Sequence, residues 1–199
     1  DYFKRKFHFQ TDGYTSEHSA RLYEHQVDIL FAGMAQAIRR TLLEEFRYYR
    51  PKKVLELGCG TGIASEMLAL KLPHASIDAT DLSKEYISYA KKMRPYININ
   101  YKALDAVEIE EKYDCIFHVF LLHELPSKIR TEVLKKQISN LNKDGKGIIL
   151  ESLQLGDVAF LDEVLLDFPK YYHEPFYKGY IEKPVEDELK QLGAKNIRV

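Results

Sequence analysis

The stretch VLELGCGTG, residues 54–62, constrains the fold of this chain more than any other feature. An apolar run of strand type ends in glycines at alternating positions, Gly58, Gly60 and Gly62, and a helix-type sequence follows directly. Glycine adopts positive φ angles readily and has no side chain to keep a ligand away from the main chain. The stretch therefore predicts a strand, a tight ligand-binding turn and a helix, in that order.

Short apolar runs alternate with helix-type segments from residue 53 onward, which is typical of β/α units. Strands that are joined by helices pair in parallel, with right-handed crossovers. The chain is therefore predicted to fold as an α/β protein with a doubly wound, mainly parallel sheet, whose ligands bind at the carboxyl ends of the strands. The predicted strands are residues 53–57, 75–80, 97–102, 113–119 and 146–152, and the predicted helices are residues 62–72, 83–93 and 127–141.

The segment ahead of the first strand is predicted to be helical. Between residues 16 and 46, apolar side chains recur at the spacing of one helix face. Gly33 interrupts this pattern and is a possible break between two shorter helices. A polar and aromatic arm, residues 1–14, precedes this N-terminal helical cap, and Thr15 or Ser16 is the candidate N-cap between them.

Composition narrows the functional class. The 29 basic and 30 acidic side chains leave a net charge of -1, so the whole chain offers no electrostatic reason to expect nucleic acid or an anionic membrane as a partner. Cys59 and Cys115 lack the spacing of zinc ligands or of a disulfide framework, and no metal ligands are predicted. No apolar run approaches the roughly 20 residues that span a bilayer. We therefore expect a soluble, cytoplasmic protein.

The residues around the glycines favour a nucleoside ligand without phosphate groups. The spacing is G-x-G-x-G, whereas a dinucleotide-binding turn requires G-x-G-x-x-G or a final alanine, and Ile63 occupies that last position. Glu56 would repel a pyrophosphate and suits a ligand that carries positive charge. Asp81 ends the second predicted strand, where its carboxylate can accept hydrogen bonds from both hydroxyls of a ribose.

Four segments together resemble the motifs of class I S-adenosylmethionine-dependent methyltransferases, namely VLELGCGTG, IDATDLS, ALDA and YDCIFHVFLLHEL. The resemblance implies a Rossmann-like fold with S-adenosyl-L-methionine as cofactor and S-adenosyl-L-homocysteine as product. The segments QTDGY and HEPFY look like the UbiE-like branch, whose acceptors are small molecules. We therefore expect an enzyme that transfers a methyl group to an unidentified small molecule by in-line displacement.

The resemblance also implies cofactor-binding residues. The glycine turn would line the amino-acid end and the ribose, Asp81 would hold the ribose, and Leu82 would pack on the adenine. Most of these features also have an alternative. The glycine turn could be only a tight connection, and Asp81 could be a helix-start acid that complements the dipole. Asp105 could lie in a solvated turn, and His118 could be an ordinary half-buried histidine. The implied cofactor-binding residues are Glu56, Gly58, Cys59, Gly60, Gly62, Asp81, Leu82, Asp105, Ala106, His118 and Phe120.

The acceptor side has fewer signals. His123, just after the fourth predicted strand, is the candidate catalytic base if the acceptor has to lose a proton, although it could instead orient the backbone. The aromatic residues within 171–180 could wall an acceptor pocket or pack a helix against the sheet. The N-terminal arm could fold over the cofactor as a lid or simply lead into the helix. The candidate substrate-binding residues are Tyr14, His123, Tyr172, His173 and Tyr177.

Other functions remain open on the sequence. The chain could be a non-catalytic S-adenosylmethionine-binding module, or it could methylate a protein or an RNA. The run FRYYRPKK, residues 46–53, could contact a nucleic acid backbone, but it is more typical of a helix terminus. The place after the fourth predicted strand lacks the Asn/Asp/Ser-Pro-Pro-aromatic motif of DNA amino-methyltransferases, so no DNA partner is expected. The sequence predicts no oligomeric state.

A chain of 199 residues is expected to form one domain. We divide it into an N-terminal arm and helical cap (1–50), a cofactor-binding core (51–157), and an acceptor-side segment with an incomplete C-terminal end (158–199). The sheet of the family ends in an antiparallel strand pair, for which only AKNIRV remains. We therefore expect one strand to be missing and the natural chain to continue, because an uncovered sheet edge is a liability.

Overall fold

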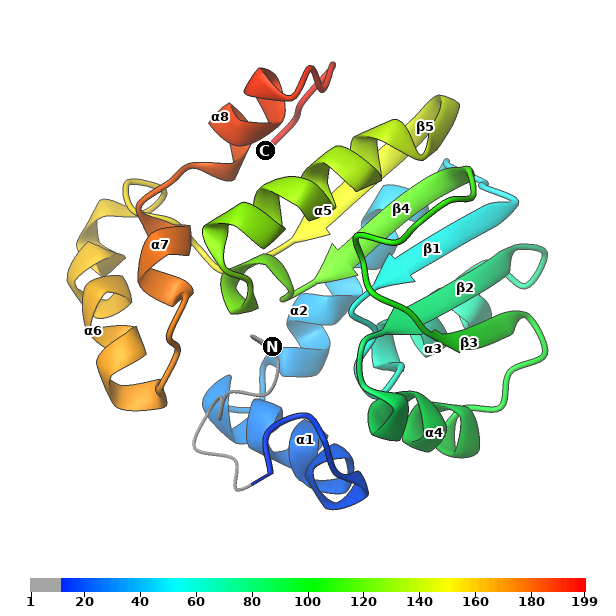
Figure 1. Ribbon diagram of the computed structural model, residues 1–199, viewed down its shortest axis with the longest axis horizontal. Helices are drawn as coiled ribbons and strands as arrows, with labels where there is room; N and C mark the ends of the chain where they lie inside the picture. The colour runs from blue at the N-terminus through cyan, green and yellow to red at the C-terminus, as the bar shows by residue number, and fades with distance from the viewer. Residues whose placement is uncertain (1–11) are drawn as a thin grey trace.

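Within residues 12–199, which the computed structural model describes, five parallel strands form one sheet (Figure 1). The strand order is β3-β2-β1-β4-β5, so the direction of winding reverses between β1 and β4. Because the pairings are parallel, the carboxyl ends of the strands share one edge, and ligands of such sheets bind where the winding reverses. The strands are β1 (Lys53–Leu57), β2 (Ser76–Asp81), β3 (Ile99–Ala103), β4 (Tyr113–Val119) and β5 (Leu141–Leu150).

Helices cover both faces of this sheet. Helix α1 packs against α4, while α5 lies over β4 and β5, and α6 and α7 lie beyond the carboxyl end of β5 (Figure 1). No helix in residues 12–199 has both the length and the apolar character that crossing a membrane requires. The helices are α1 (Glu17–Leu30), α2 (Ala35–Thr41), α3 (Ile63–Lys71), α4 (Lys84–Met93), α5 (Ser127–Ser139), α6 (Asp162–Tyr172), α7 (Tyr177–Ile181) and α8 (Val185–Gln191), with 3-10 segments η2 (Leu42–Phe46), η3 (Leu122–Glu124) and η4 (Ala159–Leu161).

Alternation along β1 divides the core between the two faces of the sheet. Val54 belongs to one buried cluster, which also contains Phe46 of η2 and Leu68 of α3. Leu55 belongs to the other cluster, which contains Val133 of α5. A parallel strand that is covered on both faces needs apolar side chains at successive positions. This requirement explains why the sequence of β1 is an almost unbroken apolar run.

The last predicted strand differs most from the structure. Strand β5 begins at Leu141, where the sequence predicted the end of a helix and then a turn. Tyr113 of β4 pairs with Leu141, and Cys115 pairs with Lys146, so a step of two residues along β4 spans five along β5. Residues 142–145 therefore bulge out of the pairing, and the predicted turn is this bulge.

The N-terminal segment forms two α-helices rather than one. Helix α1 ends at Leu30 and α2 begins at Ala35. Gly33 lies between them with φ 80°, a left-handed conformation that costs glycine little. Ser16 caps α1, because its hydroxyl oxygen accepts a hydrogen bond from the N–H of Ser19 at 3.0 Å. The predicted break at Gly33 and the predicted cap at Ser16 are both confirmed.

Two buried side chains hold α7 and the chain that follows it in place. The side-chain amide of Gln154 donates to the carbonyls of Tyr180 and Lys183, at 2.6 and 2.7 Å. Arg130 of α5 has no exposed surface and donates to the carbonyl of Gly179 at 2.8 Å. Buried carbonyl groups need such partners. These contacts therefore fix α7 and the chain that follows it relative to the sheet.

Phe46 links the helical cap to the sheet and is 0% exposed. We expect Phe46→Ala to lower the free energy of unfolding by about 3–5 kcal/mol, because the change removes a buried ring and leaves a cavity. Denaturant unfolding followed by circular dichroism measures this loss. Tyr48→Ala is the matched control, since Tyr48 is 89% exposed and its truncation should cost less than about 0.5 kcal/mol. Equal losses in the two variants would contradict this view of the core.

Candidate functional site

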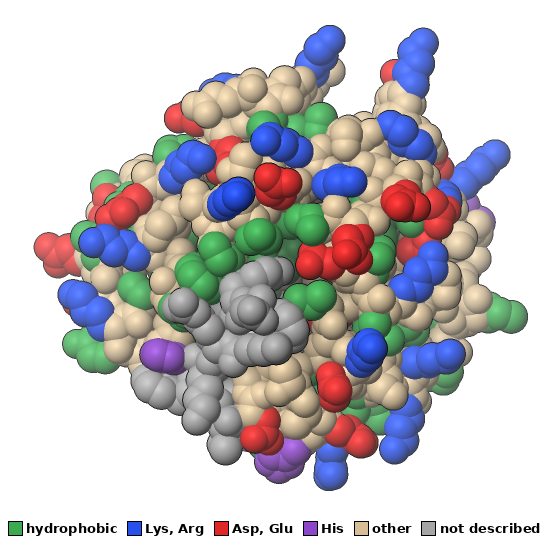
Figure 2. Space-filling view, viewed as in Figure 1, with side chains coloured by type: hydrophobic (Ala, Val, Ile, Leu, Met, Phe, Trp, Pro, Cys, Tyr) green, Lys and Arg blue, Asp and Glu red, His purple; other side chains and the backbone are tan. Residues whose placement is uncertain are grey.

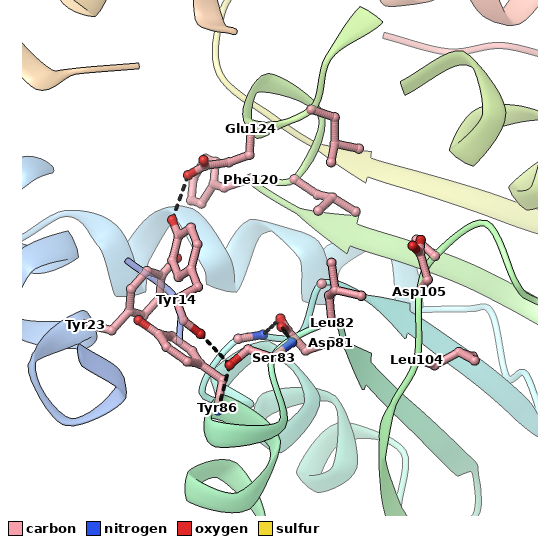
Figure 3. Close-up of a pocket in the computed structure, with 15 residues that line it drawn as sticks. Tyr14, Tyr23, Asp81, Leu82, Ser83, Tyr86, Leu104, Asp105, Phe120 and Glu124 are labelled. Carbon is pink, nitrogen blue, oxygen red and sulfur yellow. Dashed lines mark hydrogen bonds between the residues drawn. The ribbon is translucent and has the colours of Figure 1, made fainter. Parts of the chain in front are cut away.

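Residues that follow β1, β2, β3 and β4 line a cavity of about 820 Å³, which we call the main cavity (Figure 3). Its position at the carboxyl edge of the sheet, beside the reversal of winding, is where ligands of this architecture bind. The lining residues are Tyr14, Tyr23, Gly58, Gly60, Asp81, Leu82, Ser83, Tyr86, Leu104, Asp105, Ala106, Phe120, Leu121, Glu124 and Leu125.

At Gly58 and Gly62, the turn between β1 and α3 combines positive φ angles with close neighbouring side chains. Gly58 has φ 65°, and a Cβ atom there would lie 2.8 Å from Cδ1 of Leu121. Gly62 has φ 85°, and a Cβ atom there would lie 2.8 Å from the hydroxyl of Tyr101. Backbone conformation and close packing thus both require glycine. The predicted bare turn between a strand and a helix is confirmed.

Asp81, at the end of β2, is held by two backbone donors. Its Oδ2 accepts a hydrogen bond from the N–H of Gly60 at 2.9 Å, and its Oδ1 accepts one from the N–H of Ser83 at 2.8 Å (Figure 3). Burial raises the pKa of Asp81, although the backbone donors act in the opposite direction. Carboxylate oxygens have lone pairs for further donors. Asp81 therefore holds a fixed carboxylate in the wall of the main cavity.

One side of the main cavity is mostly apolar. Leu82, Leu104 and Ala106 line it, and Asp105 lies beside Leu104 (Figure 3). The carboxylate of Asp105 accepts a hydrogen bond from the N–H of Val107 at 3.1 Å, which stabilises the turn after β3. This side suits a flat ring whose edge carries polar groups.

Three tyrosine rings form the opposite side. Tyr14, Tyr23 and Tyr86 contact one another edge to face, with ring centroids 5.5–6.1 Å apart. The Tyr14 hydroxyl donates to Oε1 of Glu124 at 2.8 Å, and the Tyr14 carbonyl accepts a hydrogen bond from the Ser83 hydroxyl at 2.5 Å (Figure 3). Burial raises the pKa of each of the three phenols above its ordinary value, so they are neutral. Tyr14 thus joins the start of α4 to η3.

A second cavity of about 330 Å³ adjoins the main cavity at the glycine turn, and we call it the polar cavity. Its charged residues are Glu24, Arg39 and Glu56. The guanidinium of Arg39 donates to Oε2 of Glu24 at 2.8 Å. The two cavities together offer a mostly apolar compartment and a compartment with groups of both charges. The residues that line both cavities are Tyr23, Gly58, Gly60 and Phe120.

Phe120 lies where the two cavities meet. Its φ angle is 54°, which is unusual for a residue with a side chain. Its N–H donates to the carbonyl of Leu150 at 2.9 Å, and its ring stacks on Phe31 with centroids 4.9 Å apart. Pairing with β5 and ring packing therefore hold this residue in a strained conformation. Strain of this kind is concentrated at functional sites.

Glu56 brings a buried carboxyl group to the polar cavity. It is 2% exposed, and its Oε2 accepts a hydrogen bond from the hydroxyl of Ser65. Burial raises the pKa of Glu56 to about 8, although Ser65 and Arg39 act in the opposite direction. The carboxyl group is therefore mostly protonated at neutral pH, and a cation beside it would favour the charged form.

His123 of η3 lies behind the wall of the main cavity and is 9% exposed. Its Nδ1 is 2.7 Å from Oε2 of Glu151, which directly follows β5. Burial alone would lower the pKa of His123, but Glu151 outweighs burial and raises it to about 9. An imidazolium ring accepts no proton. The arrangement does not favour the predicted role of His123 as a catalytic base.

His118 requires a correction. It is 0% exposed and lines neither cavity in the described part of the chain. Side chains alternate between the faces of a strand, and His118 points to the face that α5 covers, near Gln137. Its Nδ1 is 3.9 Å from Oε1 of Glu151, and burial lowers its pKa to about 4. His118 is therefore a neutral core residue and does not border the ligand site.

The aromatic segment after β5 also differs from the prediction. Tyr172 is 43% exposed and stacks on Phe168 with centroids 4.6 Å apart. Tyr177 is buried, and its ring centroid lies 5.8 Å from that of His123. Among the described residues, Tyr172, His173 and Tyr177 are absent from the walls of both cavities. The alternative interpretation, a helix packed against the core, therefore fits this segment better than an acceptor pocket.

Most of the other predicted site residues line one of the two cavities. Tyr14 lines the main cavity, while Glu56 and Cys59 line the polar cavity. The predicted lid is the N-terminal arm, and its residues 1–11 lie outside the described part of the chain. Gly62 ends the turn as the N-cap of α3. The predicted residues in the wall of the main cavity are Gly58, Gly60, Asp81, Leu82, Asp105, Ala106 and Phe120.

Sequence reasoning missed several residues of the site. Tyr23 and Arg39 belong to the predicted helical cap, but local periodicity does not tell which helix face meets the glycine turn. Glu124 is adjacent to the candidate His123 and was not singled out. The missed residues in the cavity walls include Tyr23, Glu24, Arg39, Ser83, Tyr86, Leu104, Leu121, Glu124 and Leu125.

Comparison with known families decides the class of this site. A family model described as a methyltransferase domain matches residues 54–145, which include the glycine turn and Asp81. Residues 54–145 are therefore similar to a methyltransferase domain. The match covers the strands, the turn and the carboxylate that form most of the main cavity.

Curated relatives of the methyltransferase domain come from several bacteria. The chain is 31% identical over 153 residues to malonyl-[acyl-carrier protein] O-methyltransferase 2 of Ilyobacter polytropus, which is 73% of this chain and 58% of that protein. It is 27% identical over 175 residues to demethylmenaquinone methyltransferase of Thermotoga maritima, which is 84% of this chain and 75% of that protein. The chain thus spans little more than half the length of the first relative.

Solved structures confirm the fold. The methyltransferase SibL, in its apo form, matches with a TM-score of 0.67 and 17% identity, over 86% of this chain and 53% of that chain. An identity this low shows a shared fold alone. The methyltransferase domain therefore has the Rossmann-like α/β fold that the sequence predicted.

Glu56→Gln is expected to flatten the pH dependence of stability. The pKa of Glu56 is about 8 in the folded protein and 4.5 in its ordinary state. The folded state therefore holds more protons than the unfolded state between these values, and stability falls as the pH rises through them, by at most about 1.4 kcal/mol per pH unit. Glutamine has no proton to lose, so the variant should lose less stability across this window.

Urea unfolding at several pH values measures the effect. Glu132→Gln on the exposed face of α5 is the matched control and should keep the slope of the unaltered protein. Identical slopes in the unaltered protein and in Glu56→Gln would show that Glu56 is not protonated in the folded state.

Proposed function

We propose that this protein transfers a methyl group from S-adenosylmethionine to a small acceptor, either free or attached to an acyl carrier. One observation carries the proposal. Two adjoining cavities share one bare glycine turn, and they present Asp81 in the first and Arg39 with Glu56 in the second. The first cavity thus suits the adenosine end of the cofactor, which carries the ribose and the adenine. The second suits the other end, which is a zwitterionic amino acid.

The main cavity supports binding of the adenosine end. Asp81 is held by the N–H groups of Gly60 and Ser83 and can accept hydrogen bonds from two ribose hydroxyls. Leu82 and Leu104 suit the faces of the adenine ring, and Asp105 suits its amino edge. No Lys or Arg is among the described residues in this wall. A phosphorylated nucleotide would therefore lack a counter-charge here.

The polar cavity supports binding of the amino-acid end. The guanidinium of Arg39 suits the carboxylate of the ligand, and Glu56 suits its ammonium group. An ammonium group beside Glu56 would lower the pKa of that carboxyl and restore its charge. The positive sulfonium would lie at the junction of the cavities, beside the aromatic rings of Phe120 and Tyr23.

The proposed reaction is an in-line displacement. A lone pair of the acceptor forms a bond to the methyl carbon while the carbon–sulfur bond breaks, and the electrons of that bond remain on sulfur as S-adenosylhomocysteine. The protein contributes position, alignment and exclusion of water. Tyr14 and Glu124 lie across the main cavity from Leu104 and Asp105 in Figure 3. We place the acceptor on that side.

Relatives support a small acceptor. Their names specify malonyl-[acyl-carrier protein] in one case and demethylmenaquinone in another. One acceptor is attached to a carrier and the other is free, so both forms need testing.

Asp81→Asn tests the cofactor site. The change keeps the shape of the side chain but removes the charge, so we expect affinity for S-adenosylhomocysteine to fall about tenfold or more in isothermal titration calorimetry. Asp28→Asn is the matched control, because Asp28 lies exposed on α1, away from both cavities. A variant that binds as tightly as the unaltered protein would remove Asp81 from the cofactor site.

Transfer of labelled methyl groups tests the reaction. We expect label from S-adenosylmethionine in a metabolite extract or in malonyl-[acyl-carrier protein]. Tight binding with no transfer to any fraction would favour the non-catalytic module. Label in the protein or RNA fraction alone would favour a macromolecular acceptor. No binding of either S-adenosylmethionine or S-adenosylhomocysteine would overturn the proposal.

A further inference from the structure

Three potential ligand atoms converge at the end of the main cavity where Tyr14 meets Glu124. One atom each from His123, Glu124 and Glu174 lies within 4.8 Å of the other two. Glu124 lines the main cavity, while His123 and Glu174 are only 9% and 3% exposed. No other such group of His, Cys, Asp or Glu side chains is found within residues 12–199. The group is therefore internal and open to the cavity on one side.

The three donors come from two segments far apart in the chain. His123 and Glu124 form part of η3 after β4, and Glu174 follows the C-terminal end of α6. In both segments a His-Glu pair precedes a proline, as HELP and HEP. His173, between α6 and Glu174, has φ 53°, a left-handed conformation that is costly for a residue with a side chain. Arg130 donates to one carbonyl of η3 and one of α7, which holds the two segments together.

Glu151 provides a second observation, independent of the three donors, that supports a metal ligand at His123. It lies outside the group of three donors and follows β5. Its Oε1 accepts hydrogen bonds from the N–H groups of Leu121 and Leu122, and its Oε2 is 2.7 Å from Nδ1 of His123. The carboxylate therefore fixes the imidazole ring and leaves Nε2 as its second nitrogen. A histidine that binds a metal is typically oriented in this way, by a carboxylate on its other nitrogen.

We propose that Nε2 of His123 and the carboxylates of Glu124 and Glu174 bind one divalent transition-metal ion, with Zn²⁺ and Mn²⁺ as the best candidates. The His123 ring releases its Nε2 proton when it binds the ion, because a histidine ligand must be neutral. Imidazole nitrogen favours zinc and carboxylate oxygen favours manganese. Two carboxylates balance the charge of one such ion. Zinc ligands lie about 2.0–2.2 Å from the metal, so the donors close toward one another on binding. Three protein ligands leave coordination positions open to the main cavity.

The consequence for the reaction rests on the proposed function. An acceptor hydroxyl that binds the ion loses its proton to solvent more readily. A lone pair of that oxygen then forms the bond to the methyl carbon, while the electrons of the carbon–sulfur bond remain on sulfur. The ion would thus help the acceptor oxygen to lose its proton without a side-chain base. The site favours acceptors that present a hydroxyl, enol or carboxylate oxygen.

Metal titration of the full chain tests the site. The protein is first freed of metal with a chelator, and Zn²⁺ and Mn²⁺ are then added in separate calorimetric titrations. We expect one ion per chain, and we expect Glu124→Gln and Glu174→Gln each to weaken binding about tenfold or more. Co²⁺ gives a second readout, because the visible spectrum of the bound ion should show a protein coordination sphere in the unaltered protein and lose it in both variants.

Glu163→Gln is the matched control, because Glu163 is an exposed glutamate of α6 outside the cavity walls. It should bind the ions like the unaltered protein. Circular dichroism checks that each variant is folded. Glu174 lies outside the walls of both cavities, so Glu174→Gln should keep its affinity for S-adenosylhomocysteine while it loses affinity for the metal.

The outcomes separate the two proposals. No saturable binding of either Zn²⁺ or Mn²⁺ would overturn the metal site, and so would equal binding by the unaltered protein and both glutamine variants. Metal binding that follows the variants as expected, in a protein that binds no S-adenosylhomocysteine, would keep the metal site and reject the proposed function. Methyl transfer at full rate in the metal-free protein would reject the role of the ion in the reaction.

Discussion

The hydrogen bond from the N–H of Gly60 to the carboxylate of Asp81 is the interaction on which the site depends. It joins the turn after β1 to the end of β2. The parallel register brings the two strand ends together, because Leu57 pairs with Thr80, and the N–H of Cys59 then donates to the Thr80 carbonyl at 2.8 Å. A bare main chain is necessary for this approach. The strand ends therefore place a carboxylate and a row of backbone groups in the same wall of the main cavity. No side chain from a helix is needed for this arrangement.

Charge is distributed unevenly over this wall. The compartment beyond Asp81 is mostly apolar, whereas Arg39 and Glu24 place groups of opposite charge on the other side of the turn, near the buried carboxyl of Glu56. On the face shown in Figure 2, hydrophobic side chains gather near the middle of the molecule with acidic side chains beside them. Burial makes each isolated charge costly. A ligand with an ammonium and a carboxylate at one end and a neutral ring at the other would satisfy both compartments together.

Local sequence predicts the parts of the site that short segments form by themselves. The glycine turn and Asp81 were found because each lies at the end of a strand, where the position in the chain also gives the position in space. His118 was misplaced because the side chains of a strand alternate between faces, and a single position decides which face is reached. Arg39 was missed because its contact with the turn depends on how the helical cap packs. Tyr177 was misjudged because its ring packs within the α6–α7 segment and not on the cavity.

The two sides of the site are mechanically connected through Leu121. Its N–H is held by Glu151, which also orients His123. Its side chain lies where a Cβ atom on Gly58 would meet it at 2.8 Å. The glycine turn, the chain after β4 and the chain after β5 therefore pack as one unit with little free space, and a shift of η3 toward the turn would be resisted by direct contact. A change near η3 that moves Leu121 should therefore also shift the glycine turn. This holds even though His123 and Glu151 lie outside the walls of both cavities. The arrangement of the glycine turn and that of the chain after β5 therefore both depend on the conformation of η3.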